Sequence, residues 1–297
     1  MLPAGDLKQP EWQVLSNPAS APRSDDFELT PVSVPDGYDH ALQQVLLAER
    51  LREVRALTGF TRIESLSDYA EEDDPPTDHI MPLSRRPPTW VPAVEVRGEG
   101  IFLQFREETL QQWQQLPAVQ QQELVFLEGH IQWRLARHLV PPEANFPGIR
   151  YVLLHTFAHA LMRRLTLECG YTAASIRERI YALPPESEGG PMAGILLYTS
   201  APDSEGTLGG LVSLGRPEQL GWHIEGALED MQHCASDPLC AEHSSQEDHT
   251  LHEAACHACM FIPETSCERG NKYLDRSVLV RTIERNDLAF FKKVYER

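Results

Sequence analysis

Five of the six cysteines of this chain lie between residues 234 and 267, in the order Cys234-x5-Cys240-x15-Cys256-x2-Cys259-x7-Cys267. A Cys-x-x-Cys pair flanked by further cysteines is typical of a tetrahedral zinc site, because a tight turn can direct both thiolates of the pair at one ion. The outer cysteines must then return to the same ion from other segments. We therefore expect a structural zinc ion to staple the C-terminal region.

The spacing leaves the choice of ligands open, because one structural zinc takes about four ligands and the region offers five sulfurs. The nearby imidazoles are also donors: they belong to His233, His243, His249, His252 and His257. Redox-active or unrelated buried thiols are the alternatives to a metal. A catalytic zinc is less favoured, since such sites usually leave one position open to water. The first residues show neither the basic start nor the apolar run of a secretory signal, so we expect a cytoplasmic protein with metal-bound thiols rather than disulfides.

The charge of the chain limits how it can meet nucleic acid. Lys and Arg number 26 against 44 Asp and Glu, a formal net charge of -18 over 297 residues. Such a surface repels phosphate, so DNA contact should be indirect or local. Two groups of basic residues are candidates for local contacts, although pairing with the surplus carboxylates is the favoured interpretation. They are Arg50, Arg52, Arg55 and Arg62, and Arg134, Arg137 and His138. No apolar stretch is long enough to cross a membrane.

Hydrophobic periodicity and composition predict an α+β fold that is mainly helical, with a small sheet and a cysteine-rich, zinc-stapled C-terminal region. We expect an extended arm over residues 1–37, a helical and hairpin domain over 38–145, and a zinc-binding domain over 146–297. The patterns predict helices at 38–58, 107–116, 118–139, 148–169 and 217–231, and a strand at 193–200. They also predict a hairpin at 90–105 that turns at Gly98-Glu99-Gly100, and an acidic, proline-rich linker at 71–76.

Two histidines stand out in the helix expected at 148–169, which has almost no polar face. His155 and His159 are four residues apart, so both imidazoles lie on one side of the helix and can share a metal. The glutamate that serves as general base in His-Glu-x-x-His metalloproteases is replaced by Thr156. A hydrogen-bonded core pair is therefore the favoured interpretation, with a second metal or a catalytic role as the alternative. No ATP-binding loop, nucleophile elbow or dinucleotide fingerprint is visible, so an enzyme is not expected.

Three stretches carry a family resemblance: Tyr151-Val-Leu-Leu-His155-Thr-Phe-Ala-His159, Ala255-Cys256-His257-Ala258-Cys259 and Pro263-Glu-Thr-Ser-Cys267-Glu. Together with Ile195-Leu-Leu-Tyr198 and Gly209-Gly210, they resemble the MrfA-like zinc-binding domain over about residues 38–285. That family occurs in DNA-repair helicases and in DrmB-type proteins of the DISARM phage-defence system. The stretch from Trp90 to Leu103 is closer to the DrmB type, although proteins of that type are usually much longer.

The resemblance implies a non-catalytic, zinc-binding accessory subunit of a bacterial anti-phage defence complex. Such a subunit would dock to a helicase-type or nuclease-type protein and assist its action on foreign DNA. The family's pattern assigns zinc to Cys256, Cys259 and Cys267, with Cys240 as the fourth ligand and Cys234 as the alternative. The competing hypothesis is a metal-dependent hydrolase or nuclease that uses the two histidines.

Overall fold

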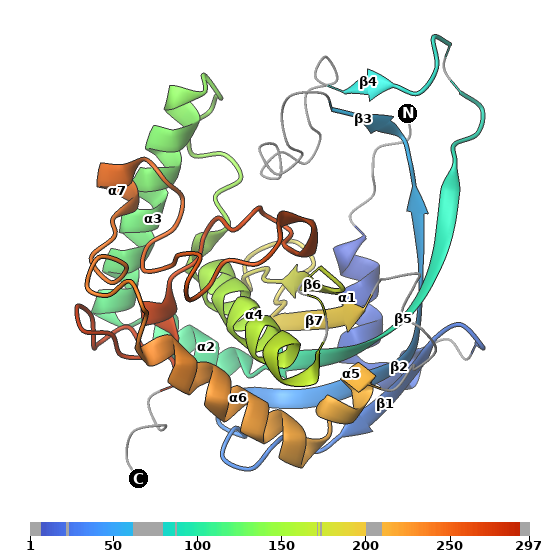
Figure 1. The fold of residues 1–297 in the computed structure, drawn as a ribbon, viewed down its shortest axis with the longest axis horizontal. Helices are drawn as coiled ribbons and strands as arrows, with labels where there is room; N and C mark the ends of the chain where they lie inside the picture. Colours follow the sequence, from blue (N-terminus) through green and yellow to red (C-terminus); the bar gives the residue numbers. More distant parts are fainter. Residues whose placement is uncertain are drawn as a thin grey trace.

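The computed structural model describes residues 7–21, 24–61, 80–86, 88–170, 172, 174–199 and 210–291. Within them a five-stranded antiparallel sheet, in the order β1-β2-β5-β7-β6, forms the centre of the fold (Figure 1). The strands are β1 (Glu28–Val32), β2 (Leu42–Ala56), β5 (Ala93–Phe105), β6 (Ile176–Tyr181) and β7 (Gly194–Thr199), with a separate pair β3 (Gly59–Phe60) and β4 (Met81–Pro82).

The helices are α1 (Lys8–Ser16), α2 (Glu107–Gln114), α3 (Pro117–Ala136), α4 (Gly148–Cys169), α5 (Gly210–Leu214), α6 (Pro217–Gln232) and α7 (Ser245–Asp248). Short 3₁₀ turns are η1 (Pro18–Ser20), η3 (Glu264–Ser266) and η4 (Arg276–Val278). None of these described helices combines the length and apolar character needed to traverse a bilayer.

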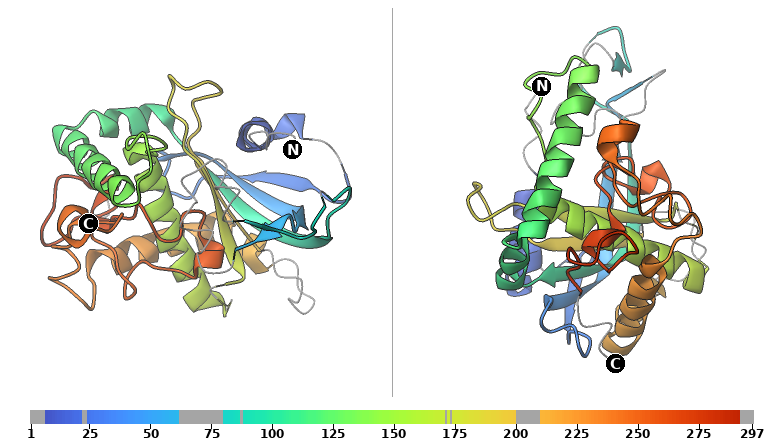
Figure 2. Two further views of the ribbon diagram at one scale, coloured as in Figure 1. Left: turned by 90° about the horizontal axis from the view of Figure 1, so that it is seen from above. Right: turned by 90° about the vertical axis from the view of Figure 1, so that its left-hand side faces the viewer.

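The two faces of the sheet pack against different helices. Leu46, Phe102 and Leu196 are cross-strand neighbours, so they share one face, and they pack with Trp12 and Leu15 of α1. The alternate positions of the same strands face the larger core, which α4 fills on the other side of the sheet. Helices α3 and α6 pack against α4, and the C-terminal segment wraps the same side (Figures 1 and 2). Helix α4 therefore lies at the centre of the core, between the sheet and the cysteine-rich region.

The expected helix at 38–58 is wrong, because this segment forms the long strand β2. Its apolar residues fit a helical stripe, but β5 offers a partner along almost the whole segment, from Leu42 opposite Phe105 to Ala56 opposite Ala93. Long-range pairing thus overrides the local pattern. The fold is α+β as expected, while the sheet is larger than the small one that the sequence predicted.

The expected hairpin turn at Gly98-Glu99-Gly100 is also wrong, since β5 runs through it as one continuous strand. The glycines instead allow close approach of β7. A Cβ atom on Gly98 would lie 2.0 Å from the carbonyl oxygen of Thr199, and one on Gly100 would lie 2.9 Å from that of Leu197. Glycine inside a strand here serves backbone contact rather than chain reversal.

Five other elements agree with the sequence predictions. Helices α2, α3, α4 and α6 and strand β7 form at the expected places, with ends within a few residues. The region expected as an extended arm contains α1 and β1, and it is packed on the sheet. The sheet itself crosses the expected domain boundary at residue 145, because β5 pairs with both β2 and β7. The expected acidic linker at 71–76 lies outside the described residues.

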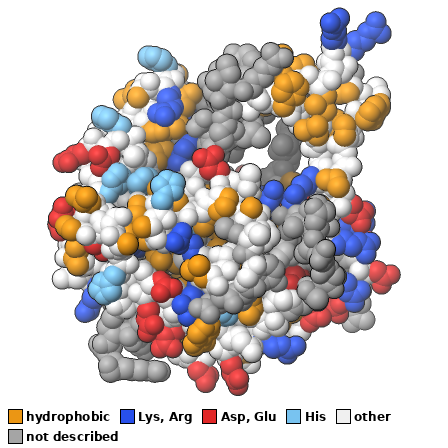
Figure 3. Space-filling view, viewed as in Figure 1, with side chains coloured by type: hydrophobic (Ala, Val, Ile, Leu, Met, Phe, Trp, Pro, Cys, Tyr) orange, Lys and Arg blue, Asp and Glu red, His pale blue; other side chains and the backbone are white. Residues whose placement is uncertain are grey.

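The far ends of β2 and β5 project beyond the rest of the sheet, since β7 reaches only Gly100 of β5 and β1 reaches only Arg50 of β2. This projecting segment, the adjoining β3–β4 pair and the described residues that connect them are called the ribbon tip, which comprises residues 51–61, 80–86 and 88–99. Its exposed large hydrophobic side chains are Val54, Leu57, Phe60, Met81, Trp90, Val91 and Val94. Figure 3 shows hydrophobic side chains gathered at its upper right, where Figure 1 draws β3 and β4.

Candidate metal centres

Four cysteines converge at the end of α6 and are called the thiol cluster: Cys234, Cys240, Cys256 and Cys259. Their Sγ atoms all lie within 4.8 Å of one another. The closest separations are 3.5 Å between Cys234 and Cys256, 3.7 Å between Cys240 and Cys259, and 3.8 Å between Cys256 and Cys259. Four sulfurs bound to one zinc at about 2.3 Å in a tetrahedron are about 3.8 Å apart. The thiol cluster therefore has the spacing of a four-thiolate zinc site.

Local hydrogen bonds place these thiols. Cys234 follows α6, and its amide donates to the Asp237 carboxylate at 2.8 Å, which folds the chain back toward Cys240. The amides of Cys259 and Met260 both donate to the Cys256 carbonyl, at 3.2 and 2.9 Å, which forms the tight turn of the Cys-x-x-Cys pair. Cys256 and Cys259 of this turn therefore reach the same place as Cys234 and Cys240, which follow α6.

A buried arginine supports the same region from inside. Arg276 donates to the carbonyls of Met231 and Gln232 at the end of α6 and to the carboxylate of Asp237. The hydrogen bond with the Cys259 thiol lowers the pKa of Cys240 to about 6, and the charge of Arg276 adds to this effect against the opposing effect of burial. The guanidinium therefore favours the thiolate form that a metal requires.

The grouping of the ligand candidates differs from the expected one. Cys240, Cys256 and Cys259 lie together, but Cys234 completes the thiol cluster and Cys267 lies elsewhere. The family resemblance favoured Cys267, whereas in the structure this residue follows η3 and lies beside His155 of α4. In the part of the chain that the structure describes, the cluster includes no histidine. His243, for example, contacts Thr250 and Asp248, each at 2.9 Å.

Cys267 belongs to a second group, called the mixed cluster: His155, His159, Glu178 and Cys267. Its four donor atoms also lie within 4.8 Å of one another. The Nε2 atom of His155 is 2.9 Å from Oε1 of Glu178 and 3.1 Å from Sγ of Cys267. The Nε2 atom of His159 is 3.5 Å from Oε2 of Glu178. The histidine pair that the sequence singled out is therefore joined by a carboxylate and a thiol.

The electrostatics of the mixed cluster follow from this proximity. Burial disfavours a charge on His155, but the Glu178 carboxylate outweighs it and raises the pKa of His155 to about 10. Burial also acts against the charge of Glu178, yet the two histidines lower the pKa of its carboxyl group far below the usual range. In Cys267, burial and the Glu178 charge oppose ionisation, and the two histidines still lower the pKa of the thiol. The cluster thus stabilises anionic donors.

Glu178 was not among the candidates from the sequence, although β6 contains a signal for it. Along this strand Ile176, Glu178 and Ile180 are buried while Arg177 and Arg179 are only partly so. A carboxylate in phase with two inward-facing isoleucines must be buried, and a buried carboxylate needs a partner. The sequence does not reveal which residues provide that partner, because they come from α4 and from the segment after η3.

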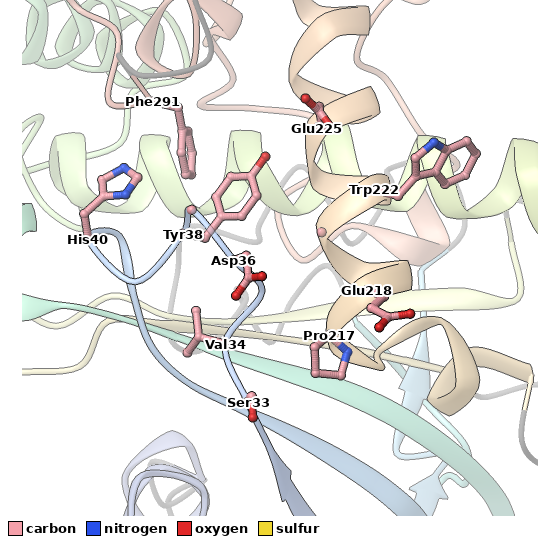
Figure 4. Close-up of a pocket in the computed structure, with 12 residues that line it drawn as sticks. Ser33, Val34, Asp36, Tyr38, His40, Pro217, Glu218, Trp222, Glu225 and Phe291 are labelled. Carbon is pink, nitrogen blue, oxygen red and sulfur yellow. The ribbon is translucent and has the colours of Figure 1, made fainter. Parts of the chain in front are cut away.

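The structure also contains an open pocket of about 680 Å³ between the β1–β2 loop and α6 (Figure 4). Three carboxylates line it, from Asp36, Glu218 and Glu225, beside the aromatic rings of Tyr38 and Trp222. Its acidic lining is suited to a cation and repels phosphate.

The geometry of the thiol cluster agrees with comparison to known proteins. Residues 157–260 match the MrfA Zn-binding domain family. The matched range contains all four residues of the thiol cluster and ends before Cys267. The resemblance noted in the sequence is confirmed, and the thiol cluster is consistent with a structural zinc ion.

A second comparison finds sequence similarity to a defence protein. The chain is 37% identical over 290 residues to the DISARM protein DrmB of Bacillus paralicheniformis. The similarity covers 96% of this chain and 49% of that protein, so the chain spans about half the length of its relative. The two comparisons thus show a zinc-binding domain in this chain and its similarity to about half of a DISARM protein.

Proposed function

We propose that this chain acts as a non-catalytic, zinc-binding accessory subunit of a bacterial anti-phage defence complex in the cytoplasm. It docks to a helicase-type or nuclease-type protein and assists that protein's action on foreign DNA. The observation that carries the proposal is the 37% identity to a DISARM protein over 96% of the chain. The zinc centre has a scaffold role in this proposal, because four thiolates fill the coordination sphere and leave no open position for water.

The ribbon tip is the docking surface in this proposal. Large exposed apolar side chains concentrated in one place are typical of protein interfaces. Trp90 is 74% exposed and Val94 is 51% exposed, and Arg85 and Arg86 follow β4 as a basic edge. The matching partner surface is apolar at its centre and acidic at its rim.

DNA contact is assigned mainly to the partner. Two of the candidate arginines of β2 form ion pairs, as the sequence interpretation favoured: Arg50 with Glu28 at 2.6 Å and Arg52 with Asp26 at 2.8 Å. Arg62 lies outside the described residues. Paired arginines and a net charge of -18 leave little attraction for phosphate. Tight, salt-resistant binding of DNA by the isolated chain would contradict this assignment.

Co-purification with helicase-type and nuclease-type proteins of the same bacterium tests the docking. We expect a stable complex that survives gel filtration and that Val94→Asp disrupts. The matched control is Leu167→Asp, which places the same charge on a leucine of α4 that is 75% exposed. Failure to bind either class of protein would overturn the proposed function. A complex that tolerates Val94→Asp would move the interface away from the ribbon tip.

The alternative function, a metal-dependent hydrolase or nuclease built on His155 and His159, has weaker support. A catalytic metal needs a position open to water or substrate. The side chains of both histidines and of Glu178 have no exposed surface. Four protein donors in a closed site have the character of a structural centre.

A further inference from the structure

The mixed cluster brings together donors from three separate parts of the fold. His155 and His159 lie one turn apart on α4, Glu178 comes from β6, and Cys267 follows η3. All four are inside the protein or nearly so, with the side chains of the histidines and Glu178 completely buried. Buried charged groups are costly unless they are paired or bind a metal.

Hydrogen bonds between a neutral His159 and Glu178 do not account for the geometry. The Nδ1 atom of His159 lies 3.1 Å from the Met260 carbonyl oxygen and donates to it, since a carbonyl can only accept. In the neutral ring, the Nε2 lone pair then faces Oε2 of Glu178 at 3.5 Å, and neither atom has a hydrogen-bond partner among the described residues. Two acceptors face each other at a distance longer than a normal hydrogen bond. Either a proton on Nε2 or a metal ion between the two atoms resolves this contact.

A single ion satisfies all four donors at once. The Nε2 atom of His155 faces both Glu178 and Cys267, and one N–H group cannot point at both. Nitrogen, oxygen and sulfur ligands of one tetrahedral zinc lie about 3.3 to 3.7 Å apart. The observed separations of 2.9, 3.1 and 3.5 Å are close to that spacing.

The surroundings resemble those of a metal centre. The amides of Arg269 and Asn271 donate to Sγ of Cys267 at 3.4 and 3.2 Å, and such donors favour a thiolate. The Ser236 amide does the same for Cys234 in the thiol cluster, at 3.4 Å. The hydrogen bond from His159 to Met260 is the outer contact that orients a metal-bound imidazole.

We propose that His155, His159, Glu178 and Cys267 bind a second structural metal ion. Two imidazoles, one carboxylate and one thiolate in a buried, four-donor site favour Zn²⁺. This second centre ties α4 and β6 to the C-terminal segment. Because Met260 directly follows Cys259, its carbonyl also links the second centre to the turn of the first.

Zinc content and X-ray absorption on the whole chain test the proposal. After loading with Zn²⁺ and dialysis, we expect two zinc ions per chain, with an average of about 2.5 sulfur ligands and about 1.5 nitrogen or oxygen ligands per zinc. One zinc per chain with an all-sulfur shell would overturn the second centre. That result would leave the thiol cluster and the proposed docking function intact.

Variants assign the second ion to its ligands. Glu178→Gln and His159→Ala should each lower the content to about one zinc and leave an all-sulfur shell. His223→Ala is the matched control, since His223 is a buried histidine on α6 outside both clusters and its loss should leave two zinc ions. Two zinc ions retained in both test variants would overturn the ligand assignment. If a variant does not fold, the absorption spectrum of the unmodified chain still decides.

Discussion

The two candidate centres are built in opposite ways. The thiol cluster takes its four ligands from one short stretch, residues 234–259, that has little regular structure after α6. The mixed cluster takes its ligands from residues 155 to 267, and three of the four lie on a long helix and a sheet strand. The first centre would supply order to its segment, whereas the second would reinforce elements that backbone hydrogen bonds and the core already hold.

Loss of one thiolate from each centre tests this difference, and the loss at the thiol cluster should produce the largest effect of all. Cys259→Ser weakens zinc binding where the chain depends on it, so we expect loss of most of the roughly 5–15 kcal/mol that keeps a domain folded. Cys267→Ser leaves α4, β6 and their core in place, and we expect a cooperative transition that is about 3 kcal/mol less stable. Thermal melts followed by circular dichroism compare the two. The opposite order of stability would refute the contrast.

An intermediate effect is expected at Arg276, which contacts the end of α6 and Asp237 beside the thiol cluster. Its side chain has no exposed surface and forms a salt bridge with Asp237. Arg276→Met leaves a largely buried carboxylate without its partner, and we expect a loss of about 3–5 kcal/mol in urea denaturation together with weaker zinc retention.

The control for Arg276 is the pair between Arg164 and Asp230, in which the aspartate side chain is 49% exposed and the two groups are 3.5 Å apart. Asp230→Asn should change the stability by no more than about 1 kcal/mol. Equal losses in Arg276→Met and Asp230→Asn would show that the arginine has no special role beneath the thiols.

The contrast between the centres also explains what the sequence could predict. The clustered cysteines in the sequence predict the thiol cluster, because its ligands are near one another along the chain. His155 and His159 were visible as a pair, but Glu178 was not, since only the pairing of β6 with β7 and its packing on α4 bring it to them. The resemblance grouped Cys267 with Cys256 and Cys259, whereas the structure places it with His155, His159 and Glu178, which the sequence could not show because those residues come from distant elements.

Prediction of the fold from the sequence has the same limit, because contacts between residues far apart along the chain are not visible in it. Helices α2, α3, α4 and α6 were predictable because their contacts repeat locally, at three to four residues. The segment 38–58 has apolar residues that suit a helix as well as a strand, and the choice depends on β5, which is about fifty residues away along the chain. Local patterns therefore identified the helices, and long-range pairing decided the sheet.

The smallest expected effect is a pH-dependent change in stability, and it distinguishes two buried carboxylates, Glu178 and Glu253. Glu178 has two histidines beside it, whereas Glu253 has the carboxylate of Asp275 nearby and only a distant cation, Arg285, at 3.8 Å. Burial raises the pKa of Glu253 to about 7; the Ser245 amide hydrogen bond and the charge of Arg285 oppose this shift, and the Asp275 charge adds to it.

The sign of the resulting pH dependence follows from the raised pKa of Glu253. The folded protein holds this proton more tightly than the unfolded chain, so stability from this group is fully present below about pH 4.5 and is lost as the pH rises through about 7. Glu253→Gln removes that loss and should stabilise the protein by about 2 kcal/mol at pH 8, with little change at pH 5. Urea denaturation at the two pH values measures the difference. Glu178→Gln should show no such gain at pH 8, because its carboxylate is stabilised in the folded state; a gain there would mean that Glu178 lacks the cationic partner on which the mixed cluster depends.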